Sequence, residues 1–178
     1  MALKSTILKA QVSLSDMDRH YYQELSLTIA QHPSENAQRL MVRLLAYLLN
    51  ADSDLEFTKG LCADDEPEIW RKSLSGEILL WVELGLPDEK RLKKAANQAQ
   101  QVLLYTYGDS KQQQWWQKNQ CKLASFSNVS VFSLDFDETQ ALSQMLARNM
   151  QFTVTVQDTE VWFASESHSV VIQPKKLQ

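Results

Sequence analysis

The stretch Ile78-Leu79-Leu80-Trp81-Val82-Glu83-Leu84-Gly85-Leu86-Pro87-Asp88 decides the fold of this chain. Its first part is apolar on both faces except at Glu83, which is typical of a strand in the middle of a sheet. Gly85 and Pro87 are turn residues, and Asp88 is a typical N-cap of a helix. We therefore expect a central strand over 78–85, followed by a helix over about 89–102.

Upstream, apolar and polar residues alternate in two segments that are joined by a polar connection. Such alternation is typical of half-buried strands, and two of them in succession indicate an antiparallel pair. The apolar positions are Leu8, Ala10, Val12 and Leu14 in the first segment and Leu25, Leu27 and Ile29 in the second. Apolar residues then recur at helical spacing over 34–50, with Ser34 as the expected N-cap.

The rest of the chain alternates between short strands and helices. We expect strands over 55–61, 69–74, 102–107, 129–134, 152–157, 161–164 and 170–172, and a short polar helix over 110–119. Helices between strands, with antiparallel hairpins at both ends, indicate an α+β sandwich with a mixed sheet. Because no Gly/Ser/Pro-rich linker interrupts the 178 residues, we expect a single domain over 1–178.

The composition excludes several classes of protein. Apolar residues make up 44% of the chain and the formal net charge is −4, so a disordered tail and a basic protein that coats duplexes are both disfavoured. Cys62 and Cys121 have no zinc-ligand spacing, and we expect both to be small buried side chains. We find no signal peptide and no apolar run long enough to span a membrane, so we expect a cytoplasmic protein that does not bind membranes.

Glu83 is the residue that does not fit its surroundings, because burying an unpaired carboxylate is costly. One interpretation is structural: the carboxylate lies at the end of the strand and pairs with a nearby lysine or arginine. The other is functional: a rigid strand holds a metal ligand or a catalytic acid/base at the edge of a cleft.

Two charged segments flank this strand. Upstream lies the acidic bend Asp64, Asp65, Glu66 and Glu68, which a strand turn at Ser75-Gly76 would return beside Glu83. Converging carboxylates would suit Mg²⁺; alternatively, the bend is a solvated acidic loop. Downstream, the expected helix carries Lys90, Arg91, Lys93 and Lys94 in its first two turns. These residues would neutralise carboxylates or the phosphates of a bound chain, or they form a solvated basic face.

Several motifs along the chain resemble the YaeQ family of Gram-negative bacteria, small proteins with a variant of the PD-(D/E)XK nuclease fold. The similarity covers essentially the whole chain. It rests on the segments 1–4, 27–35, 43–46, 64–70 and 81–89, which include Asp64-Asp65-Glu66-Pro67-Glu68 and Trp81-Val82-Glu83-Leu84-Gly85.

The resemblance implies a restriction-endonuclease-like core, a mixed sheet flanked by helices with additional antiparallel hairpins, and a nuclease-like site. Pro67-Glu68 stands where the nuclease motif has Pro-Asp, and Glu83-Leu84-Gly85 stands where it has Glu-x-Lys. Gly85 thus replaces the motif lysine, and the resemblance implies that Lys94, or else Lys93, supplies it from the helix.

The same resemblance implies the metal ligands. Glu68 and Glu83 would hold Mg²⁺, with Asp65 as a further ligand. Glu35, near the start of the first helix, matches a position where such folds often carry another acidic residue. Glu68, Glu83, Lys94 and Lys93 are therefore the expected catalytic residues.

Trp115 and Trp116 are the remaining feature of note. We expect one ring to fix the polar helix to the core; the alternative for the other ring is stacking on a nucleic-acid base. His20, His32 and His168 form no spaced pair, and no nucleophile motif for acyl transfer is present.

Two functional hypotheses follow. The first is a nuclease-like, Mg²⁺-dependent phosphodiesterase acting on nucleic acid. The second is a catalytically inactive nuclease-fold domain that binds a protein or a nucleic acid. Fold alone does not decide between them.

Overall fold

The computed structural model describes residues 5–62 and 65–178, apart from the side chain of Cys62. The chain divides into two compact units, each built from two separate segments. The first unit comprises the residues up to Leu49 together with Asp137–Pro174, and the second comprises Asn50–Phe136 together with Lys175–Gln178.

The first unit contains a five-stranded sheet in the order β10-β9-β8-β1-β2. All neighbouring strands in it are antiparallel except β1 and β8, which run parallel, with Lys9 beside Asn149. The strands are β1 (Thr6–Asp16), β2 (Tyr21–Gln31), β8 (Asn149–Gln157), β9 (Glu160–Ala164) and β10 (Ser169–Ile172). The alternation in the first two segments is confirmed, since the even-numbered positions from Leu8 to Leu14 in β1 are buried.

Helix α1 (Ala37–Leu49) belongs to this unit, and α4 (Phe136–Ser143) begins at its boundary. Every residue of α1 from Leu40 to Leu48 is buried, including Arg43. The expected N-cap at Ser34 is wrong. The backbone turns first, with the Glu35 N–H donating to the His32 carbonyl oxygen, and the Asn36 side chain then accepts from the Arg39 N–H at 2.8 Å.

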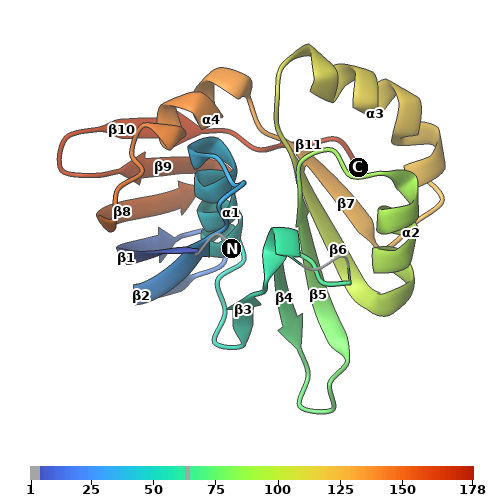
Figure 1. The fold of residues 1–178 in the computed structure, drawn as a ribbon, viewed down its shortest axis with the longest axis horizontal. Helices are drawn as coiled ribbons and strands as arrows, with labels where there is room; N and C mark the ends of the chain where they lie inside the picture. Colours follow the sequence, from blue (N-terminus) through green and yellow to red (C-terminus); the bar gives the residue numbers. More distant parts are fainter. Residues whose placement is uncertain (1–4, 63–64) are drawn as a thin grey trace. The chain divides into compact units, whose positions relative to one another are not determined.

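The second unit contains a six-stranded sheet in the order β11-β7-β6-β5-β4-β3 (Figure 1). Its central strands β5, β6 and β7 are parallel, and the remaining pairs are antiparallel. The strands are β3 (Leu55–Phe57), β4 (Ile69–Lys72), β5 (Ile78–Leu84), β6 (Ala99–Thr106), β7 (Val129–Ser133) and β11 (Lys175–Lys176). A 3-10 turn spans Gly60–Cys62.

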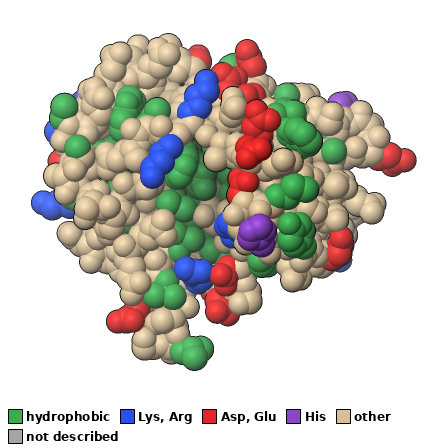
Figure 2. Space-filling view, turned by 180° about the vertical axis from the view of Figure 1, so that it is seen from behind, with side chains coloured by type: hydrophobic (Ala, Val, Ile, Leu, Met, Phe, Trp, Pro, Cys, Tyr) green, Lys and Arg blue, Asp and Glu red, His purple; other side chains and the backbone are tan. Residues whose placement is uncertain are grey.

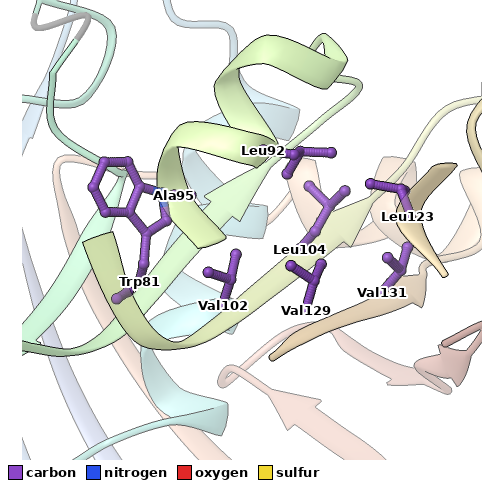
Figure 3. Packing of buried hydrophobic residues seen from close by; sticks show 9 residues of the cluster. Trp81, Leu92, Ala95, Val102, Leu104, Leu123, Val129 and Val131 are labelled. Atoms are coloured by element: carbon purple, nitrogen blue, oxygen red, sulfur yellow. The ribbon is translucent and has the colours of Figure 1, made fainter. Parts of the chain in front are cut away.

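Helices α2 (Glu89–Gln98) and α3 (Ser110–Leu123) pack on one face of this sheet. Figure 3 shows side chains of α2 above those of the strands. The buried cluster contains Trp81, Leu92, Ala95, Ala99, Val102, Leu104, Leu123, Val129 and Val131. The faces of β5 and β6 that carry Trp81 and Leu104 therefore look toward the helices.

The chain is thus an α+β protein with two mixed sheets and four helices in its described part. The expected α+β architecture with a mixed sheet is confirmed, but there are two mixed sheets, because the first strand pairs with β8, far along the chain, and the two sheets share no strand. Strand β6 also begins at Ala99 instead of 102, which shortens α2. Cys121 is exposed on α3 and not buried, since it lies away from the apolar cluster.

No helix in the described residues is long and apolar enough to cross a membrane. On the face shown in Figure 2, the Lys and Arg side chains are dispersed and form no extended stripe.

Candidate functional site

Glu83 lies one residue before the end of β5 and is 2% exposed. Its side chain lies on the same face as that of Trp81, because residues two apart on a strand share a face. The Trp81 indole Nε1 donates a hydrogen bond to Glu83 Oε2 at 3.1 Å. Strand β6 lies directly beside β5, with Leu104 next to Glu83. The carboxylate is therefore held at the carboxyl end of a central strand, on the helix-covered face.

Arg91 of α2 pairs with this carboxylate. Its Nε donates to Glu83 Oε2 at 2.9 Å, and its Nη2 donates to the Glu66 carbonyl oxygen at 2.9 Å. The Asp88 side chain caps α2 by accepting from the Arg91 N–H at 2.8 Å. Gly85 has φ +85°, a left-handed conformation that glycine adopts without strain. The short Gly85–Asp88 connection thus sets the phase of α2 so that Arg91 faces back to Glu83.

The electrostatics of Glu83 follow from this setting. Burial raises the pKa of Glu83, whereas the charge and hydrogen bond of Arg91 and the hydrogen bond from Trp81 lower it. The negative charge of Glu68 raises it further, and the net shift is upward from the ordinary value of 4.5. Glu68 and Glu83 therefore lie within electrostatic reach of each other.

Glu68, which directly precedes β4, is also 2% exposed. Its N–H donates to the Val82 carbonyl oxygen at 3.1 Å, and its own carbonyl oxygen accepts from the Thr58 N–H at 3.2 Å. Its carboxylate packs against Gly60, where an added Cβ would lie 2.8 Å from Glu68 Oε2. Gly60 also has φ +53°, so both the close approach of the Glu68 carboxylate and the left-handed backbone favour glycine at this position.

The other expected site residues separate into two groups. Lys94 contacts Asp65 through an exposed ion pair that lowers the pKa of Asp65, and Lys93 is exposed to solvent. Asp64 lies outside the described residues. Glu35 belongs to the first unit, where Arg43 Nη2 donates to its Oε2 at 2.8 Å. The structure thus brings together Glu83, Glu68 and Arg91, and it places Lys94 with Asp65.

Glu68 and Glu83 are the expected metal ligands that lie near each other in the structure. Among the described residues, no three His, Cys, Asp or Glu side chains converge in a way that could hold a metal ion. Two buried carboxylates from adjacent strands fit the oxygen preference of Mg²⁺, which keeps several waters. Glu83 Oε2, however, already accepts from Arg91 and Trp81. The donor chemistry fits Mg²⁺, and Arg91 is its competitor.

The structural interpretation of Glu83, a carboxylate near the end of a strand that pairs with a nearby lysine or arginine, matches the structure, and Arg91 is that partner. The sequence did not single out Arg91 among the four basic residues of the helix, and the lysine missing from the motif favoured Lys94 or Lys93. The position of the N-cap could have indicated Arg91, because it determines which residues of α2 face β5. With Asp88 as N-cap, Arg91 lies in the first turn of the helix, next to the end of the strand that carries Glu83.

Comparison with known proteins identifies relatives along nearly the whole chain. The family model described as YaeQ protein matches residues 1–174. The curated "Uncharacterized protein YaeQ" of Escherichia coli (strain K12) is 48% identical over 172 residues, which are 97% of this chain and 95% of that protein. The protein of the same name from Salmonella typhi is 46% identical over 173 residues, 97% of this chain and 96% of that one.

Two solved structures are similar over 98% of this chain. The crystal structure of the YaeQ protein from Xanthomonas axonopodis pv. citri has a TM-score of 0.96 at 43% identity and is covered over 99% of its length. That of the YaeQ protein from Pseudomonas syringae has a TM-score of 0.93 at 32% identity, with 96% of its length covered.

Proposed function

The chain belongs to the YaeQ family, and we propose that it is a nuclease-like protein that acts with Mg²⁺ on the phosphodiester backbone of nucleic acid. The observation that carries this proposal is the pair of buried carboxylates, Glu68 and Glu83. Glu68 directly precedes β4 and Glu83 lies in the neighbouring strand β5, and the charge of Glu68 raises the pKa of Glu83. Two like charges brought together in a buried place favour binding of a cation.

The order of elements supports a restriction-endonuclease-like core. After α1, the chain runs through the meander β3-β4-β5, then α2, then β6 parallel to β5. The sequence resemblance assigned Pro67-Glu68 and Glu83 to the second and third strands of such a core. Glu68 directly precedes β4 and Glu83 lies in β5, in agreement with that assignment.

In this proposal the chain's own residues bind and orient the substrate. Glu68 and Glu83 would hold Mg²⁺, with Asp65 near the rim, and the ion would polarise a phosphate and lower the pKa of a bound water. Arg91 would release Glu83 and turn its guanidinium to a phosphate oxygen, a geometry for which the planar fork is suited. Lys94, or else Lys93, would supply the amine that the motif places at Gly85.

A second function is favoured by one observation: the Arg91–Glu83 ion pair. A guanidinium that holds Glu83 Oε2 at 2.9 Å occupies the place of a metal ion. A nuclease fold that keeps this pair would bind nucleic acid or a protein without cleaving it.

Cleavage of labelled single- and double-stranded DNA and RNA in Mg²⁺ or Mn²⁺ tests the proposal. We expect the parent protein to cleave, Glu83→Gln to be inactive, and Glu77→Gln, which changes an exposed carboxylate at the β4–β5 turn, to retain activity. About 10 mM ion should also raise the Tm of the parent and of Glu77→Gln but not of Glu83→Gln.

The alternatives have different outcomes in the same assays. Binding of a substrate without cleavage in either metal would favour the inactive binding domain. Absence of cleavage together with no metal-dependent change in Tm would overturn the phosphodiesterase proposal.

A further inference from the structure

A cavity of about 420 Å³ lies in the second unit, at the carboxyl ends of the parallel strands β6 and β7 and beside the start of α3. Ligands of sheets with parallel strands commonly bind at this edge. The volume is within the range of small-molecule sites. Its lining includes Gln112, Trp116, Ser133, Phe136 and Lys175.

Gln112 is the built polar element of this cavity, because it is 8% exposed and fixed on its nitrogen side. Its Nε2 donates to Thr106 Oγ1 at 2.7 Å, to Ser133 Oγ at 2.7 Å and to the Thr106 carbonyl oxygen at 3.1 Å. No hydrogen bond to its Oε1 occurs within the described part of the chain, and Oε1 is not among the buried, unsatisfied atoms. The Gln112 side-chain amide is therefore held in one orientation, and its Oε1 is a hydrogen-bond acceptor for a ligand in the cavity.

Hydrogen-bond donors and further acceptors lie near Gln112 in the lining of the cavity. Ser133 Oγ accepts from Gln112, so its hydroxyl proton is available to donate. Lys175 of β11 pairs with Ser133 of β7, which places its side chain on the same face of the sheet. Asp109, also in the lining, adds carboxylate oxygens at the start of α3. A ligand here would meet acceptors and donors side by side.

The two tryptophans of α3 have different environments. The Trp115 indole donates to the Pro87 carbonyl oxygen at 2.8 Å and so joins α3 to the loop that follows β5. Trp116 is half-buried and lines the cavity together with Phe136. Both rings pack against the apolar cluster of this unit, and the remaining surface of Trp116 borders the cavity.

We propose that this cavity binds a nucleobase. Aromatic side chains supply a stacking surface for a planar ring, and the donors and acceptors match the edge groups of a base. Guanine carries N–H donors and a carbonyl acceptor on one edge, complementary to Asp109, Gln112 and Lys175. Duplex bases are stacked and paired, so the substrate class is nucleic acid with an unpaired base.

The position of the cavity relative to Glu83 fits a chain that spans both. Glu83, Leu104 and Val131 form one row across β5, β6 and β7, and Thr106 and Ser133 lie in the next row toward the carboxyl ends. Glu83 and Ser133 are separated by two strand-to-strand spacings across the sheet and by two residues along the strands, a distance of about 12 Å between backbones. This inference deepens the proposed function and rests on it only for the path of the phosphate chain.

Calorimetric titration of the metal-free protein with 5′-GMP, and with ribose 5-phosphate as a control without a base, tests the proposal. We expect 5′-GMP to bind at least about 10-fold more tightly than ribose 5-phosphate, and Trp116→Leu to weaken it by about 5-fold or more. Lys175→Ala, on an exposed strand, should weaken it less. Trp70→Leu, a half-buried tryptophan of β4 outside the lining, serves as the matched control and should not change it.

A second measurement requires no variant. In ¹⁵N-resolved NMR spectra, 5′-GMP should shift the indole signal of Trp116 and leave that of Trp70 in place. Equal affinity for 5′-GMP and ribose 5-phosphate, or an unshifted Trp116 signal, would overturn the base-binding proposal. Glu83→Gln should keep 5′-GMP binding. If the parent protein binds 5′-GMP but cleaves no nucleic acid, the phosphodiesterase proposal is contradicted and the base-binding proposal stands. If it cleaves nucleic acid but does not bind 5′-GMP, only the base-binding proposal is contradicted.

Discussion

Each of the two units contains a buried carboxylate that pairs with an arginine eight residues later in the chain. In the first unit, Arg43 Nη2 lies 2.8 Å from Glu35 Oε2, and the side chains are 4% and 2% exposed. In the second, Arg91 Nε lies 2.9 Å from Glu83 Oε2, and the side chains are 26% and 3% exposed. The carboxylates are alike, whereas only the second arginine reaches solvent.

This difference distinguishes an enclosed pair, Glu35–Arg43, from a partly open one, Glu83–Arg91. Arg43 also donates to the Ala30 carbonyl oxygen at 2.9 Å and is buried. It therefore joins α1 to the end of β2. Arg91 is held by Glu83 and by the Glu66 carbonyl oxygen, but about a quarter of its side chain is exposed. In the proposed function, a ligand or metal ion would exchange with this arginine and not with the enclosed Arg43.

Breaking the enclosed pair should have the largest effect on stability. Arg43→Met leaves Glu35 buried without its guanidinium, and we expect a loss of about 3–5 kcal/mol in the free energy of unfolding, measured in urea. The double variant Glu35→Gln/Arg43→Met should recover part of this loss, because no buried charge remains. A loss below about 1 kcal/mol in the single variant would contradict a structural role for the pair.

Breaking the open pair should cost less. Arg91→Met removes one of two donors to Glu83 Oε2, but water can enter where the guanidinium was. We expect a loss of about 1–3 kcal/mol by urea unfolding. As a control, Lys90→Met, which changes an exposed residue of the same helix, should have little effect on the free energy of unfolding. If Arg91→Met costs as much as Arg43→Met, the second pair is as closed as the first and the exchange of ligands at Glu83 is refuted.

The raised pKa of Glu83 predicts a smaller, pH-dependent effect. The folded protein holds this proton more tightly than the unfolded chain, so stability falls as pH rises from about 4.5 through the raised pKa. Glu83→Gln removes the titration. Its stability relative to the parent should therefore increase over that pH interval and stay constant above it. Urea unfolding across the interval measures the difference, and Glu77→Gln should show no such trend.

The smallest effect concerns the exposed pair of the second unit. The hydrogen bond and charge of Lys94 lower the pKa of Asp65 from its ordinary value of 3.8. Lys94→Met should return that pKa to its ordinary range, as followed by NMR titration of the side-chain carboxyl, with little change in Tm. An unchanged pKa would show that Lys94 does not remain beside Asp65 in solution, which would leave the amine available to Glu83.

Local patterns predicted most of the elements, and tertiary pairing accounts for what they missed. The alternation in β1 and the helical spacing in α1 reflect burial against one neighbour, which a single segment reveals. The parallel pairing of β1 with β8 involves partners far apart in the chain, so no local period could indicate two separate sheets.

The same distinction applies to the site. Glu83 was identified because a carboxylate in an apolar strand conflicts with its surroundings. Its partner could not be identified in this way, because Arg91, Lys93 and Lys94 lie in one helix and only the starting phase of that helix selects among them. The sequence resemblance implied a lysine, whereas the structure places an arginine in contact with Glu83.

The pairing of Lys9 in β1 with Asn149 in β8 has a consequence for biosynthesis. A ribosome releases all of β3 to β7 before β8 emerges, so the central strands of the second unit can assemble while β1 still lacks its parallel neighbour. During this interval the edge of β1 that later pairs with β8 has no hydrogen-bonding partner strand. Pairing over so long a separation is slow and exposes strand edges to other chains. Translation speed between β2 and β8 therefore sets how long the nascent chain is at risk of aggregation.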